Sequence, residues 1–241
     1  MAPTLKIGQN IEGFEVQEYC KTYGVNNAES YIVTDKKGRT AIMKIIIDGC
    51  SSVEFADSTR KLMKRMYSMP KLISYGIVNI DSIDYRFMVR ELSDGIRLSE
   101  FLKDGSVYSW DEAVIIMQQV LCALGVMHTR GIIHNDVTPR NVIVDVYDAT
   151  LVGFGHLSSE SSGGRARFKM NDLNPWYMAP ETMRHRFNVR SDIFSAGALM
   201  YTMLFGVEPW FDEKLEVDSV AALREVRRRS VQEICQNQTM K

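Results

Sequence analysis

The chain has 241 residues and a mass of 27.5 kDa, enough for one large domain or two small lobes with a buried core. Hydrophobic residues make up 45% and charged residues 24%, which is typical of globular proteins and argues against a largely disordered chain. The 29 Lys and Arg residues nearly balance the 30 Asp and Glu residues. The net charge of −1 therefore excludes a strong overall attraction to nucleic acid or to anionic lipid.

The cysteines are scattered and form no CxxC pair, which favours free thiols in a reducing compartment over disulfides or a zinc site. They are Cys20, Cys50, Cys122 and Cys235. No segment reaches the roughly eighteen apolar residues that a membrane span requires, and the longest candidate, 196–207, is better explained as a core helix. The first ten residues lack the apolar stretch of a signal peptide. We therefore expect an intracellular protein, cytoplasmic or nuclear, without a membrane span.

Up to about residue 95, short β-rich runs alternate with turn signals, and apolar residues at helical spacing occupy one interval between them. We expect two hairpins and one helix here: strands at 31–34, 40–47, 72–78 and 85–92, and a helix at 53–66. This pattern predicts a small antiparallel β lobe that contains one helix.

After Gly95 the pattern becomes helical. Ser109 followed by Glu112 is typical of a capping box, which marks the start of a helix. Apolar residues follow at helical spacing, at Val114, Met117, Leu121 and Leu124. We therefore expect the α+β class and a single domain over 1–241, with a β lobe at about 12–92 and a mainly helical lobe at 93–241.

Two motifs carry residues suited to phosphate chemistry. Lys44 ends the run Ala41-Ile42-Met43-Lys44 on a predicted strand, where a lysine must either reach solvent or meet an anion such as a phosphate. The segment 134–141 places Asp136 and Asn141 five residues apart, between a long helix and an apolar run. At that spacing a carboxylate can accept a hydroxyl proton while an amide oxygen binds a metal ion that holds phosphates.

Two further motifs complete a recognisable order. They are Gly153-Phe154-Gly155 and Tyr177-Met178-Ala179-Pro180-Glu181, the latter followed by Ser191-Asp192 and Ser195-Ala196-Gly197. From about Tyr19 to Phe211 the chain resembles the eukaryotic-type protein kinases, whose H-R-D-x-x-x-x-N, D-F-G and A-P-E motifs occur in this order. Small-molecule phosphotransferases of the aminoglycoside-kinase type have a similar loop, but they are not expected to carry the last motif. The resemblance implies a bilobal fold, here with a C-lobe that is shorter than usual.

The resemblance also implies ATP and Mg²⁺ as cofactors and a protein as substrate or partner, with no nucleic acid. By position, Lys44 would contact the α- and β-phosphates, Asp136 would orient or deprotonate the substrate hydroxyl, and Asn141 would ligate Mg²⁺. Gly24 would belong to the glycine-rich loop, and the backbone of Glu91 and Leu92 would meet the adenine.

The remaining carried-over residues have structural or regulatory roles in the family. Asp192 would brace the catalytic loop, and His134 and Phe154 would pack between the lobes. Gly155 and Glu181 would complete their motifs, with Arg184, Arg186 and Arg190 as nearby partners for the Glu181 carboxylate.

The chain departs from the family at the metal site and at the phosphate-binding loop. Gly153 stands where the D-F-G aspartate is expected and offers no side-chain oxygen to a metal. The glycine-rich loop keeps only Gly24, and Glu29 adds a negative charge near the expected phosphates. Thr138 occupies the place of a lysine that faces the γ-phosphate.

Smaller departures concern regulation and the nucleotide pocket. Arg90 precedes the expected hinge, where an apolar residue is usual. The helix residue that would pair with Lys44 stays open between Glu54, Asp57 and Thr59. Asn135 replaces the arginine before Asp136, so we expect no switching through a phosphorylated loop, and 156–173 is typical of a solvated Ser/Gly-rich loop.

Two hypotheses follow from these residues. In the first, the chain is a pseudokinase, Ser/Thr-kinase-like, in which phosphoryl transfer from ATP is weak or lost and the fold serves as a signalling or binding module. In the second, it is an active Ser/Thr protein kinase with a noncanonical metal site, supported by Lys44, Asp136 and Asn141. The sequence does not decide whether Gly153 is natural or introduced.

Overall fold

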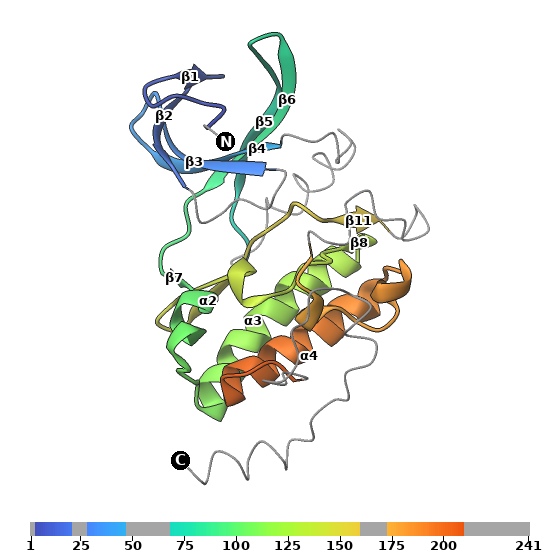
Figure 1. The fold of residues 1–241 in the computed structure, drawn as a ribbon. Coiled ribbons are helices and arrows are strands. Elements are labelled where there is room, and N and C mark those ends of the chain that lie inside the picture. Colours follow the sequence, from blue (N-terminus) through green and yellow to red (C-terminus); the bar gives the residue numbers. More distant parts are fainter. Residues whose placement is uncertain (1–2, 21–27, 47–67, 160–172, 210–241) are drawn as a thin grey trace. The chain divides into compact units, whose positions relative to one another are not determined.

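The computed structural model describes residues 3–20, 28–46, 68–159 and 173–209, and the chain divides into two compact units, 1–93 and 94–241 (Figure 1). The helix expected at 53–66 lies outside the described residues, and so does Gly24.

The first unit is built on a six-stranded antiparallel sheet in the order β1-β2-β3-β4-β6-β5. Its strands are β1 (Asn10–Ile11), β2 (Phe14–Tyr19), β3 (Ala28–Asp35), β4 (Thr40–Ile46), β5 (Leu72–Ile80) and β6 (Ile83–Glu91). Both expected hairpins are confirmed, because β3 pairs with β4 and β5 pairs with β6. Asp81 and Ser82 have positive φ in the second turn, the backbone that matches the twist of a tight hairpin.

One face of this sheet forms the core of the first unit, since alternate residues of its strands are buried. The most buried members are Tyr31, Val33, Met43, Ile45 and Val89, all 0% exposed. Leu5 of the N-terminal segment joins the same cluster.

Glu29 belongs to this buried side of β3, which corrects its expected place near phosphates. The strand begins at Ala28, three residues earlier than predicted, so Glu29 lies on the same face of the strand as Tyr31. Its carboxylate accepts the Tyr31 hydroxyl and the backbone N–H of Thr4, the latter at 2.8 Å. Burial, followed by the hydrogen bond to Glu29, raises the pKa of Tyr31 well above its usual value. The carboxylate therefore ties the N-terminal segment to the sheet.

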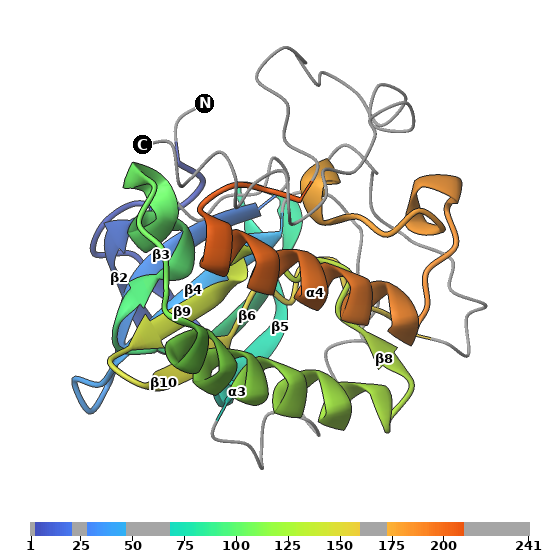
Figure 2. The ribbon, with the colours of Figure 1, turned by 90° about the horizontal axis from the view of Figure 1, so that it is seen from below.

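The second unit is mainly helical, and its two long helices, α3 (Trp110–His128) and α4 (Val189–Phe205), lie side by side (Figure 2). The other helical elements are short: α2 (Leu98–Phe101), η2 (Leu102–Asp104), η3 (Pro139–Asn141), η6 (Pro175–Tyr177) and η7 (Thr182–Arg184). Its strands are β7 (Ile96–Arg97), β8 (Ile132–Ile133), β9 (Val142–Asp145), β10 (Asp148–Leu151) and β11 (Ser158–Ser159). The α+β fold class is thus confirmed, with a β unit followed by a mainly helical one.

The capping box of α3 is confirmed, but its predicted apolar stripe is partly wrong. The Ser109 side chain accepts the backbone N–H of Glu112, and the Glu112 carboxylate accepts the backbone N–H of Ser109 at 2.9 Å. Leu121 is 42% exposed, whereas Ala113 and Ala123 are fully buried. The buried face turns toward these small residues because α4 and β10 pack on that side of the helix.

In the described part of the chain, α3 alone is long enough and apolar enough to cross a membrane, which corrects the expectation that no segment reaches that length. Core helices pass the same test, so this is a weak indication. Asp111 and Glu112 occupy the first turn of α3. The helix packs against α4 and β10. These features are those of a core helix.

Replacing Ser109 with Ala should lower the free energy of unfolding by about 1 kcal/mol, because an N-terminal backbone N–H of α3 loses its acceptor. Urea denaturation followed by circular dichroism measures the change. Ser109→Asn is the matched control, since asparagine also caps helices and should keep most of the stability. Equal losses in both variants would contradict the capping role.

Candidate active site

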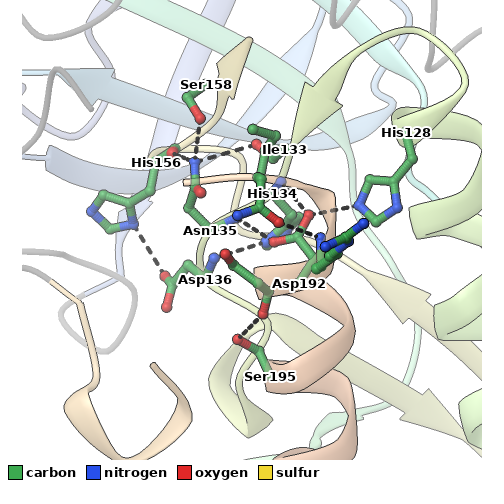
Figure 3. Close-up of polar contacts among 12 residues, drawn as sticks. His128, Ile133, His134, Asn135, Asp136, His156, Ser158, Asp192 and Ser195 are labelled. Atoms are coloured by element: carbon green, nitrogen blue, oxygen red, sulfur yellow. Dashed lines mark hydrogen bonds and ion pairs between the residues drawn. The ribbon is translucent and has the colours of Figure 1, made fainter. Parts of the chain in front are cut away.

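The candidate site lies in the second unit, where two strand pairs bring distant segments together. β8 pairs with β11, with Ile133 opposite Ser158, and β9 pairs with β10. The segment 134–141 connects β8 to β9, and 152–157 connects β10 to β11. The two segments therefore lie side by side, as Figure 3 shows for His134, Asp136 and His156.

Asp192 binds the first two residues of the segment 134–141 through hydrogen bonds. One carboxylate oxygen accepts the backbone N–H of His134 at 2.7 Å and contacts His128 Nε2 at 2.8 Å. The other oxygen accepts the backbone N–H of Asn135 at 2.8 Å. Asp192 is completely buried on α4, so this one side chain joins α3, α4 and the loop. A buried carboxylate with several donors is a rigid support for the backbone it holds.

His134 is fully buried and links the loop to the strand end at Val152. Its Nε2 donates to the Val152 carbonyl at 3.0 Å, and its Nδ1 accepts the backbone N–H of Asp136 at 3.2 Å. The ring meets Phe154 edge-on, with centroids 5.8 Å apart. Burial lowers the pKa of His134. The imidazole is therefore neutral and serves as a fixed spacer beside Asp136.

The Asp136 carboxylate is nearly buried, with 12% of its side chain exposed. Its Oδ2 accepts from the Asn141 amide at 2.7 Å and contacts His156 Nδ1 at 3.2 Å. Burial alone would raise the pKa of Asp136, but the hydrogen bond and charge of His156, with help from His134 and Asn141, lower it overall. Asp136 is therefore an ionised hydrogen-bond acceptor.

Gly153 directly abuts the side chain of Asn141. Its φ is +90°, a backbone conformation that favours glycine. A Cβ atom added at Gly153 would lie 2.2 Å from both Cγ and Oδ1 of Asn141. The Asn141 amide nitrogen also donates to the Asp136 carbonyl at 2.8 Å, which holds the side chain in this place. The Asn141 side chain thus occupies the space that any side chain at 153 would need.

These residues supply fewer side-chain oxygens than the magnesium site that the resemblance implies. Gly153 supplies no oxygen, and the Asn141 oxygen faces the Gly153 backbone. Among the residues that the structure describes, no group of three or more His, Cys, Asp or Glu side chains could hold a metal ion. Magnesium requires near-octahedral oxygen coordination, commonly from one or two carboxylates together with substrate phosphates and water. Among the described residues, Asp136 is the carboxylate beside Asn141.

Asn135 and the residues that it contacts were only partly anticipated. Asn135 has a φ of +66°, which asparagine tolerates better than most residues. Its amide donates to the His156 carbonyl at 2.7 Å and to the Ser158 hydroxyl at 2.9 Å. His156 and Ser158 are 4% and 6% exposed, so the expectation of a solvated loop is wrong at this end of 156–173. One signal in the sequence could have indicated these contacts: His156 directly follows the motif Gly153-Phe154-Gly155.

Thr138 is buried, and the Glu181 carboxylate has a hydrogen-bond partner other than the arginines expected. Thr138, at the sequence position where the family has a lysine, is buried, with 3% exposure. The Glu181 carboxylate accepts the Ser191 hydroxyl at 3.0 Å, and no arginine pairs with it among the described residues. Gly155 lies in the turn between Phe154 and His156, where its N–H donates to the Gly153 carbonyl at 2.7 Å.

The first unit holds the other predicted site residues. Lys44 lies on β4, opposite Ser30 of β3 and Met88 of β6. At the end of β6, the Arg90 guanidinium donates to the Glu91 carbonyl at 2.9 Å. This is the backbone carbonyl expected to meet adenine.

The hinge segment has one more backbone bond. The Glu91 N–H donates to the Lys71 carbonyl at 2.9 Å, and Leu92 is 44% exposed. Both backbone groups of Glu91 are therefore engaged within the first unit.

Comparison of the sequence with known proteins finds a matching family and several relatives. The family model described as "Protein kinase domain" matches residues 27–240. The chain is 33% identical over 126 residues to Calcium-dependent protein kinase 6 of Plasmodium berghei. The matched region covers 50% of this chain and 8% of that protein. It is 28% identical over 200 residues to Calcium-dependent protein kinase 8 of Arabidopsis thaliana, covering 80% and 35% respectively.

A third relative is Serine/threonine-protein kinase PEPKR2 of Arabidopsis thaliana, 26% identical over 192 residues, covering 75% of this chain and 40% of that protein. The chain therefore spans less than half the length of each of these curated relatives.

Replacing Asp192 with Ala should be among the most damaging single changes in the second unit. It leaves two loop N–H groups and the His128 ring without their buried acceptor, and each buried donor left unsatisfied costs about 1–3 kcal/mol. Thermal and urea unfolding measure the loss. Asp192→Asn keeps one acceptor oxygen and should fall between wild type and Asp192→Ala; no difference between the two variants would argue against the bracing role.

Proposed function

The chain belongs to the protein kinase family, with serine/threonine kinases among its relatives, and we propose that it is a member in which phosphoryl transfer from ATP is weak or lost. The observation that carries the proposal is the contact between Gly153 and Asn141. The family uses ATP with Mg²⁺ and acts on proteins. At the position of the D-F-G carboxylate, this chain has no side chain, and the neighbouring Asn141 side chain fills the space.

The expected energetic effect of this arrangement is large. Metal ions and fixed charges stabilise the charge that develops on a transferred phosphoryl group, an effect worth several kcal/mol. Each loss of about 1.4 kcal/mol slows a reaction tenfold. A site that holds the metal poorly is therefore expected to be slower by several orders of magnitude.

The first unit supports the same proposal from the nucleotide side. Arg90 donates to the Glu91 carbonyl, which leaves this oxygen one lone pair, and the Glu91 N–H is bonded to the Lys71 carbonyl. A ligand that uses this edge must compete with the bonds already present. The proposal includes weak ATP binding and a role as an intracellular signalling or binding module, whose partner would be a protein.

A second candidate function rests on the state of Asp136. Its pKa is lowered despite burial, so the carboxylate is ionised and can accept a hydroxyl proton. Asn141 lies beside it, at 2.7 Å. These two contacts favour an active Ser/Thr protein kinase with a noncanonical metal site as the alternative.

Intact-protein mass after incubation with ATP and Mg²⁺ or Mn²⁺ separates the two candidates. We expect no added phosphate and no thermal shift from ATP, since the metal site and the hinge are both compromised. Asp136→Asn is the control. Phosphate units present in the wild type but absent from the control would establish the active kinase instead.

A second test addresses the packing at Gly153. Gly153→Ala should destabilise the protein more than Gly105→Ala, because both glycines have positive φ but only Gly153 lacks room for a Cβ. The backbone alone costs about 1–2 kcal/mol, and the clash should add about 1–3 kcal/mol. Urea denaturation measures both variants.

The double variant Asn141→Gly with Gly153→Ala isolates the pair. Removing the Asn141 side chain should restore at least about 1 kcal/mol of the loss at Gly153, a coupling typical of residues in contact. Strictly additive effects would mean that Asn141 does not occupy this space. For the same reason, Gly153→Asp alone should not restore phosphoryl transfer.

A further inference from the structure

His156 is a buried side chain in contact with Asp136, and none of the motifs discussed above gives it a role. Its ring Nδ1 lies 3.2 Å from Asp136 Oδ2, and only 4% of the residue is exposed. Figure 3 shows the ring beside the carboxylate and the His156 backbone beside the Asn135 amide.

The chemistry of the acceptor decides which ring nitrogen carries the proton. Oδ2 of Asp136 accepts from the Asn141 amide and so acts as an acceptor, which makes Nδ1 of His156 the donor. His134 is arranged in the opposite way: its Nδ1 accepts from the Asp136 backbone, and its Nε2 donates to Val152. Two imidazoles therefore flank Asp136 with their protons on different nitrogens.

The ring of His156 is held in place by its own backbone. The Asn135 amide donates to the His156 carbonyl at 2.7 Å, and Ser158 pairs with Ile133 two residues further on. Fixing the backbone at His156 and at Ser158 reduces the conformational entropy that the ring would lose on contacting Asp136.

We propose that His156 is a positioning residue that, together with Asn141, fixes the Asp136 carboxylate in one orientation. Both side chains contact Oδ2, at 3.2 and 2.7 Å. Within the described residues no hydrogen bond reaches Oδ1, so the orientation presents this oxygen to the hydroxyl group of a substrate or ligand. The inference concerns how Asp136 is held and stands whether or not phosphoryl transfer occurs.

Imidazole tautomers provide a direct test, because the chain has only four histidines. Long-range ¹H–¹⁵N correlation of the ¹⁵N-histidine-labelled protein, at one pH near neutrality, distinguishes protonated from unprotonated ring nitrogens. We expect His156 to carry a proton on Nδ1 and His134 to carry its proton on Nε2. A neutral His156 with its proton on Nε2 alone would overturn the proposal.

The control for this measurement is Asp136→Asn. An amide can donate to the ring as well as accept from it, so His156 should lose its preference for the Nδ1–H form. His134 should keep its tautomer, since its partners are backbone groups. An unchanged His156 in this variant would mean that something other than Asp136 sets its tautomer.

A second measurement tests positioning separately from stability. In His156→Leu, three-bond couplings should show the Asp136 χ1 angle averaging between rotamers, whereas wild type should show one rotamer. His156→Asn should restore the single rotamer, because its amide nitrogen can take the place of Nδ1. A purely structural role would lower stability and leave the Asp136 couplings unchanged.

If His156→Leu does not fold, the tautomer of the wild type and the couplings in His156→Asn still decide the proposal. None of these measurements uses ATP. Detection of phosphoryl transfer would therefore overturn the proposed loss of activity and leave this inference intact, and the reverse also holds.

Discussion

The candidate site depends on one buried carboxylate, that of Asp192. Its two oxygens accept the backbone N–H groups of His134 and Asn135, and one of them also contacts His128. A buried carboxylate that loses its hydrogen-bond donors is costly, so moving the loop away from Asp192 would greatly lower the free energy of unfolding. This constraint fixes the backbone at the start of the loop, and the positions of His134, Asn135 and Asp136 follow from it.

The same loop brings Asp136, Asn141 and Gly153 together. Asn141 donates to both the backbone and the side chain of Asp136, and its oxygen lies against Gly153. A larger residue at 153 would displace Asn141, so the glycine and the asparagine form one packed unit. On the other side of Asp136, His156 contacts the same oxygen as Asn141. Local hydrogen bonds thus hold Asp136 in place, and position 153 contributes no carboxylate to the site.

Features set by neighbouring residues were predictable from the sequence. The hairpins follow from turn residues between alternating strands, and the start of α3 follows from Ser109 and Glu112. Features set by distant residues were not. Glu29 was expected near phosphates, but the register of β3 and the N-terminal segment bury it beside Tyr31. Leu121 was expected in the core, but the packing of α4 and β10 turned the helix toward Ala113 and Ala123.

By itself, the sequence determined the family, the order of the motifs and the absence of a carboxylate at 153, because these are matters of residue type and spacing. Only the tertiary structure decided what surrounds Asp136. The contact of His156 with Asp136 joins residues 20 positions apart, and the contact of Asp192 with His134 joins residues 58 positions apart. Such contacts depend on strand pairing and helix packing, which no local pattern specifies. The lack of room for a side chain at position 153 likewise follows from the fold, because the fold places Asn141 against Gly153.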